Sequence, residues 1–164
     1  MKLLHNIGPR YNSNYNTIEE ILAYDGPISF DGVYKNVFEH AHRLVGKDIT
    51  LFVMGNYVGK DNSFDVGQRP ETYCTWDEII SLCEILQCKL AWHTWSHENL
   101  TLLTDEEIIR EITPPFYMKS IAYPYGNVDS RVAKLVEKAG YEEAWSVTQG
   151  DGSRFQRKRS YLNW

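Results

Sequence analysis

Residues 49–55 read ITLFVMG, and this run is apolar on both faces of an extended strand. Such a strand is typical of a parallel sheet that is covered on both sides. In both directions from it, helical and extended patterns alternate along the chain. Because parallel strands are joined by right-handed crossovers, usually helices, the alternation predicts a mainly parallel α/β sheet with helices outside it.

The predicted helices begin and end at recognisable signals. Thr-x-x-Glu boxes, in which two side chains satisfy the first free N–H groups of a helix, occur at residues 17–20, 75–78 and 104–107. Pro114 stops the third of these helices, and Gly140 closes a helix predicted at residues 129–139. The other predicted elements are a helix at 36–45 and strands at 27–30, 89–92, 120–123 and 142–148. With no linker or repeat between them, residues 1–164 are predicted to form one domain.

The composition of the 164 residues excludes several classes of function. Hydrophobic residues make up 43% and charged residues 24%, as in ordinary globular proteins. The formal charge of −5 gives no electrostatic basis for binding nucleic acid or an anionic membrane, and no apolar run approaches the length of a membrane span. The N-terminus has no sustained apolar stretch, so we expect no signal peptide. The three cysteines show no CxxC spacing and suggest no disulfide framework, so we expect a cytoplasmic location.

Candidate functional residues follow three of the predicted strands. Asp31 follows PISF, His93 and His97 follow KLAW, and the turn Pro124-Tyr125-Gly126 follows SIAY. Active residues of parallel sheets gather at the carboxyl ends of the strands, so we expect these groups to meet. Two imidazoles and one carboxylate leave positions on a metal open for water and substrate, which predicts a hydrolytic site with one divalent ion. We expect zinc, although imidazole ligands also suit nickel, cobalt and iron.

The stretch AWHTWSHENL, residues 91–100, carries the histidine pair between two tryptophans. Four residues equal one helical turn, which would bring His93 and His97 onto one face. Trp92 ends an apolar strand and is predicted to be buried. Trp95 lies between the two histidines, and we expect its ring to pack beneath the site.

Three longer stretches carry a family resemblance: ISFDGVY at 28–34, HTWSHENLT at 93–101, and IAYPYGNVDSRVAKLVEKAGYEEAWSV at 121–147. Together they resemble the motifs of NodB-type polysaccharide deacetylases, carbohydrate esterase family 4. The resemblance covers residues 26–160. It implies a distorted or incomplete (β/α) barrel of about six to seven mainly parallel strands with outer helices.

The resemblance also implies an activity and a set of roles. Members of this family remove N- or O-acetyl groups from sugars or polysaccharides, with a divalent metal held by one Asp and two His. It implies His93 and His97 as metal ligands, Asp31 as a catalytic residue or ligand, and the backbone N–H of Tyr125 as an oxyanion donor. The implied partner is an acetylated sugar or glycan. The side chains expected to contact it are Pro124, Tyr125, Trp95 and Trp145.

The sequence departs from the family pattern in four places. One is the lack of an evident Asp-x-x-Asp-Trp stretch, for which Trp145 or Asp151 could stand in. The first motif normally holds two aspartates, a general base followed by a metal ligand. If the motif is aligned without a gap, Asp31 is at the position of the base and Gly32 is at the position of the ligand. If the alignment is shifted by one residue, Asp31 is at the position of the ligand and no residue is left to act as the base. Ala122 replaces the arginine of the third motif, and the Leu-x-Leu-x-His motif that supplies the general acid is not found near the C-terminus. His5 is placed before the domain.

These departures leave a second hypothesis open. A chain without a recognisable general acid, and with one aspartate in place of two, could bind carbohydrate or metal without turnover. The sequence therefore predicts a metal-dependent carbohydrate deacetylase, with a catalytically impaired binding protein as the alternative.

Overall fold

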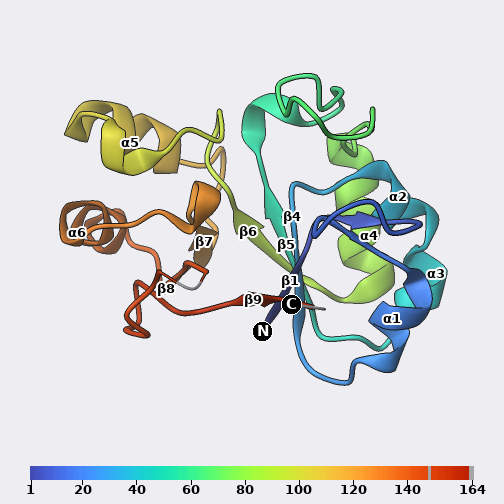
Figure 1. Cartoon of the computed structure of the whole chain (residues 1–164). Helices are drawn as coiled ribbons and strands as arrows, with labels where there is room; N and C mark the ends of the chain where they lie inside the picture. Colours follow the sequence, from blue (N-terminus) through green and yellow to red (C-terminus); the bar gives the residue numbers. More distant parts are fainter. Residues whose placement is uncertain (148, 163–164) are drawn as a thin grey trace.

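The computed structural model describes residues 1–147 and 149–162, and within them seven parallel strands form one sheet curled into a half-barrel (Figure 1). The strand order is β8-β7-β6-β5-β4-β1-β9. The strands of this sheet are β1 (Lys2–Leu4), β4 (Ile28–Asp31), β5 (Ile49–Val53), β6 (Lys89–Trp92), β7 (Ser120–Ala122), β8 (Glu143–Trp145) and β9 (Ser160–Tyr161). A separate two-stranded ladder pairs β2 (Asn6–Ile7) with β3 (Tyr15–Asn16). The predicted parallel α/β barrel is confirmed.

The central strands are buried from end to end, which explains their apolar sequences. Every residue of β4 and β5 is buried, and Phe30 pairs in register with Leu51. In β6 the burial increases from the exposed Lys89 to Trp92, which is 0% exposed. Because all these strands run in the same direction, the residues that follow β4, β6 and β7 emerge at one edge of the sheet.

Helices cover the sheet, with α1 to α4 beside one half and α5 and α6 beside β7 and β8 (Figure 1). The α-helices are α1 (Ile18–Ala23), α2 (Lys35–Glu39), α3 (Ala41–Leu44), α4 (Trp76–Leu86), α5 (Asp105–Ile112) and α6 (Ser130–Lys138). The 3₁₀ turns are η1 (Gly55–Tyr57), η2 (Leu100–Leu102) and η3 (Pro124–Gly126). All three Thr-x-x-Glu boxes form as predicted, at the starts of α1, α4 and α5. None of the helices in the described residues is long and apolar enough to cross a bilayer.

Two predicted elements differ from the structure. The helix expected at 36–45 is divided into α2 and α3 at His40. The carbonyl oxygen of Asn36 accepts a hydrogen bond from the backbone N–H of His40 and another from the His40 ring Nδ1–H, with 2.8 Å between Nδ1 and the oxygen. The hydrogen bond from the side chain competes with continuation of the helix. The strand expected at 142–148 is present as the shorter β8, Glu143–Trp145. Residue 148 of that predicted strand, and residues 163–164 of the predicted domain, lie outside the described residues.

The two ends of the chain close the sheet together. β1 pairs with β4 on one side and with β9 on the other. At the start of the β9 segment, Ser146 donates its N–H to Arg157 at 2.8 Å, and Arg159 donates to Ser146 at 3.2 Å, so this segment also contacts the end of β8. The placement of His5 before the domain is therefore wrong, because β1 is an internal strand and the basic tail supplies its neighbour.

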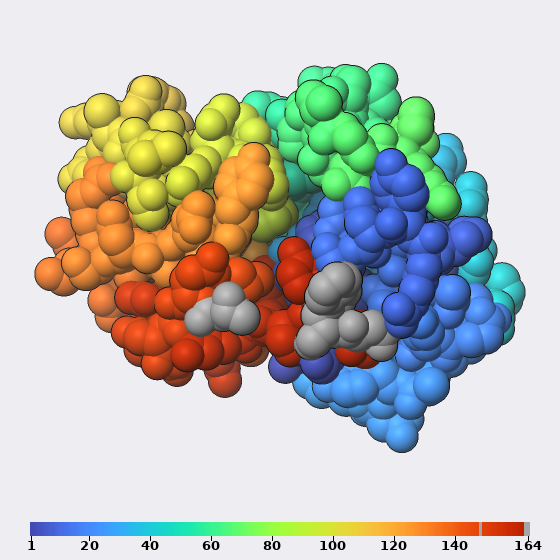
Figure 2. All heavy atoms as spheres, in the orientation of Figure 1, coloured from blue at the N-terminus to red at the C-terminus, as the bar shows by residue number. Residues whose placement is uncertain are grey.

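The N-terminal segment also holds the long loop at 56–73. Figure 2 shows this green loop against the blue N-terminal segment on the face where the red C-terminal segment also lies. Tyr11 donates to the carbonyl of Gly67 at 3.3 Å, and Asn12 donates to Gln68 at 2.9 Å. The Arg69 guanidinium lies 4.7 Å from the centre of the Tyr11 ring. These contacts fix the loop beside the carboxyl ends of the strands.

The position of β1 generates a stability prediction. Leu4 is 0% exposed within the main apolar cluster, so Leu4→Ala should lower the free energy of unfolding by about 2–5 kcal/mol through lost burial and a residual cavity. Urea unfolding followed by tryptophan fluorescence measures the change. Leu102→Ala is the control, because Leu102 is 81% exposed and should change stability by less than about 0.5 kcal/mol. Equal stability of the two variants would contradict an internal β1.

Candidate active site

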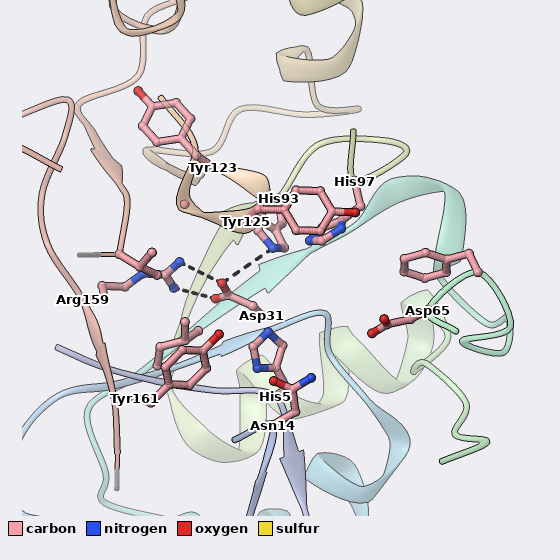
Figure 3. A pocket seen from close by; sticks show the side chains of 14 residues that line it. His5, Asn14, Asp31, Asp65, His93, His97, Tyr123, Tyr125, Arg159 and Tyr161 are labelled. Atoms are coloured by element: carbon pink, nitrogen blue, oxygen red, sulfur yellow. Dashed lines mark hydrogen bonds and ion pairs between the residues drawn. The ribbon is translucent and has the colours of Figure 1, made fainter. Parts of the chain in front are cut away.

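A cavity of about 270 Å³ opens at the carboxyl edge of the strands (Figure 3). Its wall combines the ends of β1, β4, β6 and β7 with the loop at 56–73 and the C-terminal segment. Apart from tyrosines, six titratable or charged residues line the cavity: His5, Asp31, Asp65, His93, His97 and Arg159. Sequence reasoning had selected three of these six, and the structure brings those three together.

Asp31 and Arg159 form a two-pronged ion pair at the base of the cavity. Arg159 Nη1 lies 2.6 Å from Asp31 Oδ1, and Nη2 lies 2.8 Å from Oδ2. Both side chains are almost fully buried. Burial would raise the pKa of Asp31, but the charge of Arg159 and its hydrogen bonds, together with His93 and His5, more than offset burial, so the pKa of Asp31 lies below its ordinary value. Asp31 is therefore an ionised, oriented carboxylate.

Arg159 packs against a small buried apolar cluster beside Asp31. Phe52, Ala91 and Ala122 form one small buried cluster, and the Arg159 guanidinium lies over the Phe52 ring at 4.8 Å. Its Nη1 also donates to Ser29 Oγ at 3.0 Å. The guanidinium that pairs with Asp31 thus comes from the C-terminal segment, while position 122 is an alanine. Sequence reasoning missed it because QRKRS carries several basic residues and no pattern marks which one turns inward.

His93 presents one free nitrogen to the cavity. Its Nδ1 lies 2.8 Å from the carbonyl oxygen of Ala122, and since a carbonyl only accepts, Nδ1 carries the proton. The Nε2 lone pair therefore faces Asp31, whose Oδ2 is 3.6 Å away. Burial lowers the pKa of His93, against the opposing effect of the Asp31 charge, so the ring is neutral in this state.

His97 approaches His93 through a loop and not through the helical turn that the spacing suggested. Thr94 and His97 have φ values of 69° and 59°, and His97 donates its N–H to Thr94 Oγ1 at 3.1 Å. The two imidazole rings lie 4.9 Å apart. Glu111 fixes the loop from α5, accepting from the N–H groups of Trp95 and Ser96 at 2.9 and 2.8 Å. The histidines converge as predicted, but left-handed backbone and a carboxylate brace produce the convergence.

His5 is the functional candidate that the sequence analysis placed outside the domain. It directly follows Leu3 and Leu4, so the strand next to β4 delivers its ring to the cavity. Its Nδ1 is buried and has no hydrogen-bond partner among the described residues. Burial lowers the pKa of His5 to about 4 even though the Asp31 charge opposes the effect. The sequence does contain Leu-Leu-His at residues 3–5. It lies near the N-terminus, whereas the family pattern places its histidine motif near the C-terminus.

The Pro-Tyr-Gly turn forms the adjoining wall. Tyr125 has a φ of 58°, and its half-exposed ring lies 4.7 Å from the ring of His97. A Cβ on Gly126 would lie 2.2 Å from a Val147 methyl group, so only glycine fits there. Of four non-glycine residues with positive φ in the described chain, three (Thr94, His97 and Tyr125) flank this cavity. Such strain is found where a site must be held in one shape.

Three residues predicted to contact substrate do not line the cavity. Pro124 is buried behind the turn. Trp95 packs on Trp92 at 5.0 Å between ring centres, and its Nε1 donates to the carbonyl of Thr113 at 2.8 Å. Trp145 lies under the Arg157 guanidinium at 4.6 Å, away from the cavity wall. The structure gives these three side chains packing contacts.

The histidine pair has the donor chemistry that a divalent metal requires. His93 offers the Nε2 lone pair, and the buried Nδ1 of His97 has no partner among the described residues. Burial lowers the pKa of His97 to about 3, so both rings are neutral, as metal ligands must be. Within residues 1–147 and 149–162, however, no group of three or more His, Cys, Asp or Glu side chains is arranged around one metal position. The two imidazoles fit a metal; a full set of three protein ligands is not assembled.

Gly32 explains the incomplete set. It stands where the ungapped alignment places the ligand aspartate, with a φ of +67°. A Cβ there would lie 2.8 Å from Met54 Cε and 2.9 Å from Tyr73 Cε1. A side chain at this position would need left-handed backbone and a shift of the Met54 and Tyr73 side chains.

Sequence comparisons identify similar proteins. The sequence model described as polysaccharide deacetylase matches residues 27–144. Chitin deacetylase 1 of Cryptococcus neoformans var. grubii is 31% identical over 109 residues, covering 57% of this chain and 21% of that protein. Chitin deacetylase 1 of Saccharomyces cerevisiae is 39% identical over 57 residues, covering 29% of this chain and 19% of that protein. The chain thus spans about a fifth of the length of these relatives.

Solved structures share the fold over nearly the whole chain. IcaB from Ammonifex degensii has a TM-score of 0.72 and 14% identity, covering 98% of this chain and 89% of that chain. The Streptococcus pyogenes deacetylase PplD, in complex with acetate, has a TM-score of 0.70 and 10% identity, covering 99% of this chain and 92% of that chain. At these identities the likeness establishes the common architecture.

The buried ion pair generates the prediction for this site. Arg159→Met leaves the Asp31 carboxylate buried without its partner and should lower the free energy of unfolding by about 3–5 kcal/mol. Adding Asp31→Asn removes the stranded charge, so the double variant should regain at least half of that loss. Urea unfolding at neutral pH measures both. A single variant as stable as the parent would show that the pair does not hold the structure together.

Proposed function

Because the chain belongs to the polysaccharide deacetylase family, we propose that it is a metal-dependent hydrolase that removes acetyl groups from an N- or O-acetylated sugar or polysaccharide. One observation carries the proposal: an ionised Asp31, clamped by Arg159, shares a cavity with two neutral imidazoles. This combination supplies a base and metal donors within one water-accessible pocket. Acetylated glycan is the substrate class that agrees with the family.

Asp31 is proposed as the general base that takes a proton from the attacking water. Arg159 fixes both carboxylate oxygens and keeps them ionised, which a base requires before the reaction. His93 Nε2, 3.6 Å from Oδ2, places the base beside the histidine pair. Since Gly32 cannot contribute a carboxylate, Asp31 is assigned to proton transfer and the histidines to metal.

His93 and His97 would hold the ion, with water and substrate oxygens at its other positions. A bound divalent metal would polarise the acetyl carbonyl and lower the pKa of a water molecule. Zinc best suits two imidazole nitrogens with open positions. The hydrogen bond from His93 to Ala122 fixes the tautomer and the direction of Nε2.

The remaining steps are assigned to Tyr125 and His5. The η3 turn holds the backbone of Tyr125 in a fixed left-handed conformation at the cavity wall, and its N–H is proposed to donate to the carbonyl oxygen as negative charge develops there. His5 lies on the strand next to β4 with an unpartnered ring nitrogen. It is proposed to relay the proton that Asp31 takes from the attacking water to the departing amine or alcohol.

A second candidate function has a specific observation in its favour. Glycine stands at position 32, and no cluster of three ligands is present among the described residues. A protein with this cavity could hold an acetylated sugar without hydrolysing it. The two candidates differ in one measurable property, the release of acetate.

Acetate release from a panel of N- and O-acetylated sugars and oligosaccharides, measured with zinc present, tests the proposal. The parent should release acetate, and Asp31→Asn should reduce the rate by about 10²–10⁴-fold because an amide cannot accept the proton. Zinc content of Asp31→Asn should stay close to that of the parent. Sugar binding without acetate release would favour the second candidate, and parallel loss of zinc and activity in Asp31→Asn would make Asp31 a ligand.

Zinc content separates the roles of the histidines. His93→Ala removes a ligand and should reduce bound zinc to the level of a non-binding protein, measured by elemental analysis after dialysis. His5→Gln is the matched control: it should keep the zinc and lose only acetate release, because His5 is assigned to proton transfer. Equal zinc in His93→Ala and the parent would remove the histidine pair from the metal site.

A further inference from the structure

The charges around the cavity do not cancel. Asp31 and Arg159 neutralise each other through two hydrogen bonds, so the cavity's arginine is already engaged. Among the described residues that line the cavity, Asp65 is the remaining carboxylate, and no lysine is present. No hydrogen bond or ion pair to the Asp65 carboxylate is formed within the described residues. The cavity therefore carries one uncompensated negative charge.

Asp65 is held at the cavity by a well-ordered loop structure. Its backbone N–H donates to the carbonyl of Asn62 at 2.9 Å. The buried Asn62 side chain in turn donates to the Arg69 carbonyl at 2.8 Å and accepts from the Glu71 N–H at 2.9 Å. Figure 3 shows the Asp65 carboxylate directed toward the cavity, on the far side of His97 from Arg159. The loop thus presents a fixed, half-buried carboxylate to whatever occupies the cavity.

The surroundings of Asp65 suit a sugar that bears a positive charge. Phe64 lies next to it, with its ring 6.0 Å from the ring of His97, and Tyr125 lies 4.7 Å from His97 on the other side. These aromatic faces suit the apolar face of a pyranose ring. With the Asp65 carboxylate beside these rings, this side of the cavity combines aromatic surface with a negative charge.

A second, independent feature shows that the pocket is built for a polar ligand. The buried Nδ1 of His5 has no partner among the described residues, and His5 is one of the residues that line the cavity. Buried polar atoms are rarely left unpaired unless a ligand or water satisfies them. His5 and Asp65 thus leave unmet hydrogen-bonding capacity at two separate parts of the wall.

We infer that the site takes an amino-sugar chain that is already partly deacetylated, with an ammonium group on Asp65 while the acetyl group of a neighbouring sugar lies at Asp31 and the histidine pair. This inference rests on the proposed function for the identity of the acetyl end. An ammonium donates charge-assisted hydrogen bonds to a carboxylate, whereas an acetamide at the same position brings no charge. Phosphorylated sugars and uronic acids would be repelled by the same carboxylate.

Binding to the chelator-treated protein tests the inference without turnover. The probes are two tetrasaccharides of N-acetylglucosamine, one fully acetylated and one in which a residue next to an acetylated sugar carries a free amine. Isothermal titration at pH 6, where the amine is an ammonium, should show tighter binding of the amine-bearing probe by the parent. Asp65→Asn should reduce the ratio of the two affinities about tenfold, because the charge is lost and the shape is kept.

Asp61→Asn is the matched control. Asp61 lies on the same loop, but its exposed carboxylate accepts from Ser63 N–H at 3.1 Å, outside the cavity wall, so the affinity ratio should stay that of the parent. A parent without preference, or an Asp65→Asn variant that retains it, would overturn the inference. Lower zinc affinity in Asp65→Asn with an unchanged ratio would also overturn it, since the carboxylate would then serve the metal. Acetate release by the zinc-loaded parent tests the proposed function separately.

Discussion

A buried guanidinium-carboxylate pair connects the two halves of this molecule. Arg159 directly precedes β9 and Asp31 ends β4, and 128 residues separate them in sequence. Each charge would be costly in the apolar interior alone, so each requires the other. The pair therefore fixes the C-terminal segment between β8 and β1 and, at the same time, places an ionised carboxylate at the base of the cavity.

The same pair constrains the chemistry that the cavity can support. A carboxylate held at both oxygens by Arg159 is well suited to proton transfer and less available as a metal ligand. The adjacent Gly32 contributes no second carboxylate. The proposed function therefore assigns metal binding to His93 and His97, whose orientation depends on the Ala122 carbonyl and on left-handed backbone in the loop. In this proposal, proton transfer belongs to Asp31 and metal binding to the two histidines, whereas a site with two adjacent aspartates uses a carboxylate for each role.

Local signals in the sequence predicted much of this structure. The Thr-x-x-Glu boxes start helices because their hydrogen bonds lie within four residues, and the apolar run at 49–55 requires burial on both faces. Asp31, His93 and His97 could be grouped because parallel strands bring their carboxyl ends to one edge. Two predictions that rested on sequence spacing alone were wrong. The histidine pair lies on a strained loop and not on a helical turn, and His40 divides the helix that was predicted to be continuous.

By itself, the sequence determined the parallel α/β architecture, the edge at which the site forms and three of its side chains, because periodicity and capping act over short distances. Only the tertiary structure decided that Arg159 neutralises Asp31, that His5 enters the cavity from β1, and that Asp65 stays unpaired at its mouth. These facts depend on how the two ends of the chain and the loop at 56–73 meet the sheet. No local pattern records such contacts, because the free energy that selects them comes from burial and charge pairing between distant segments.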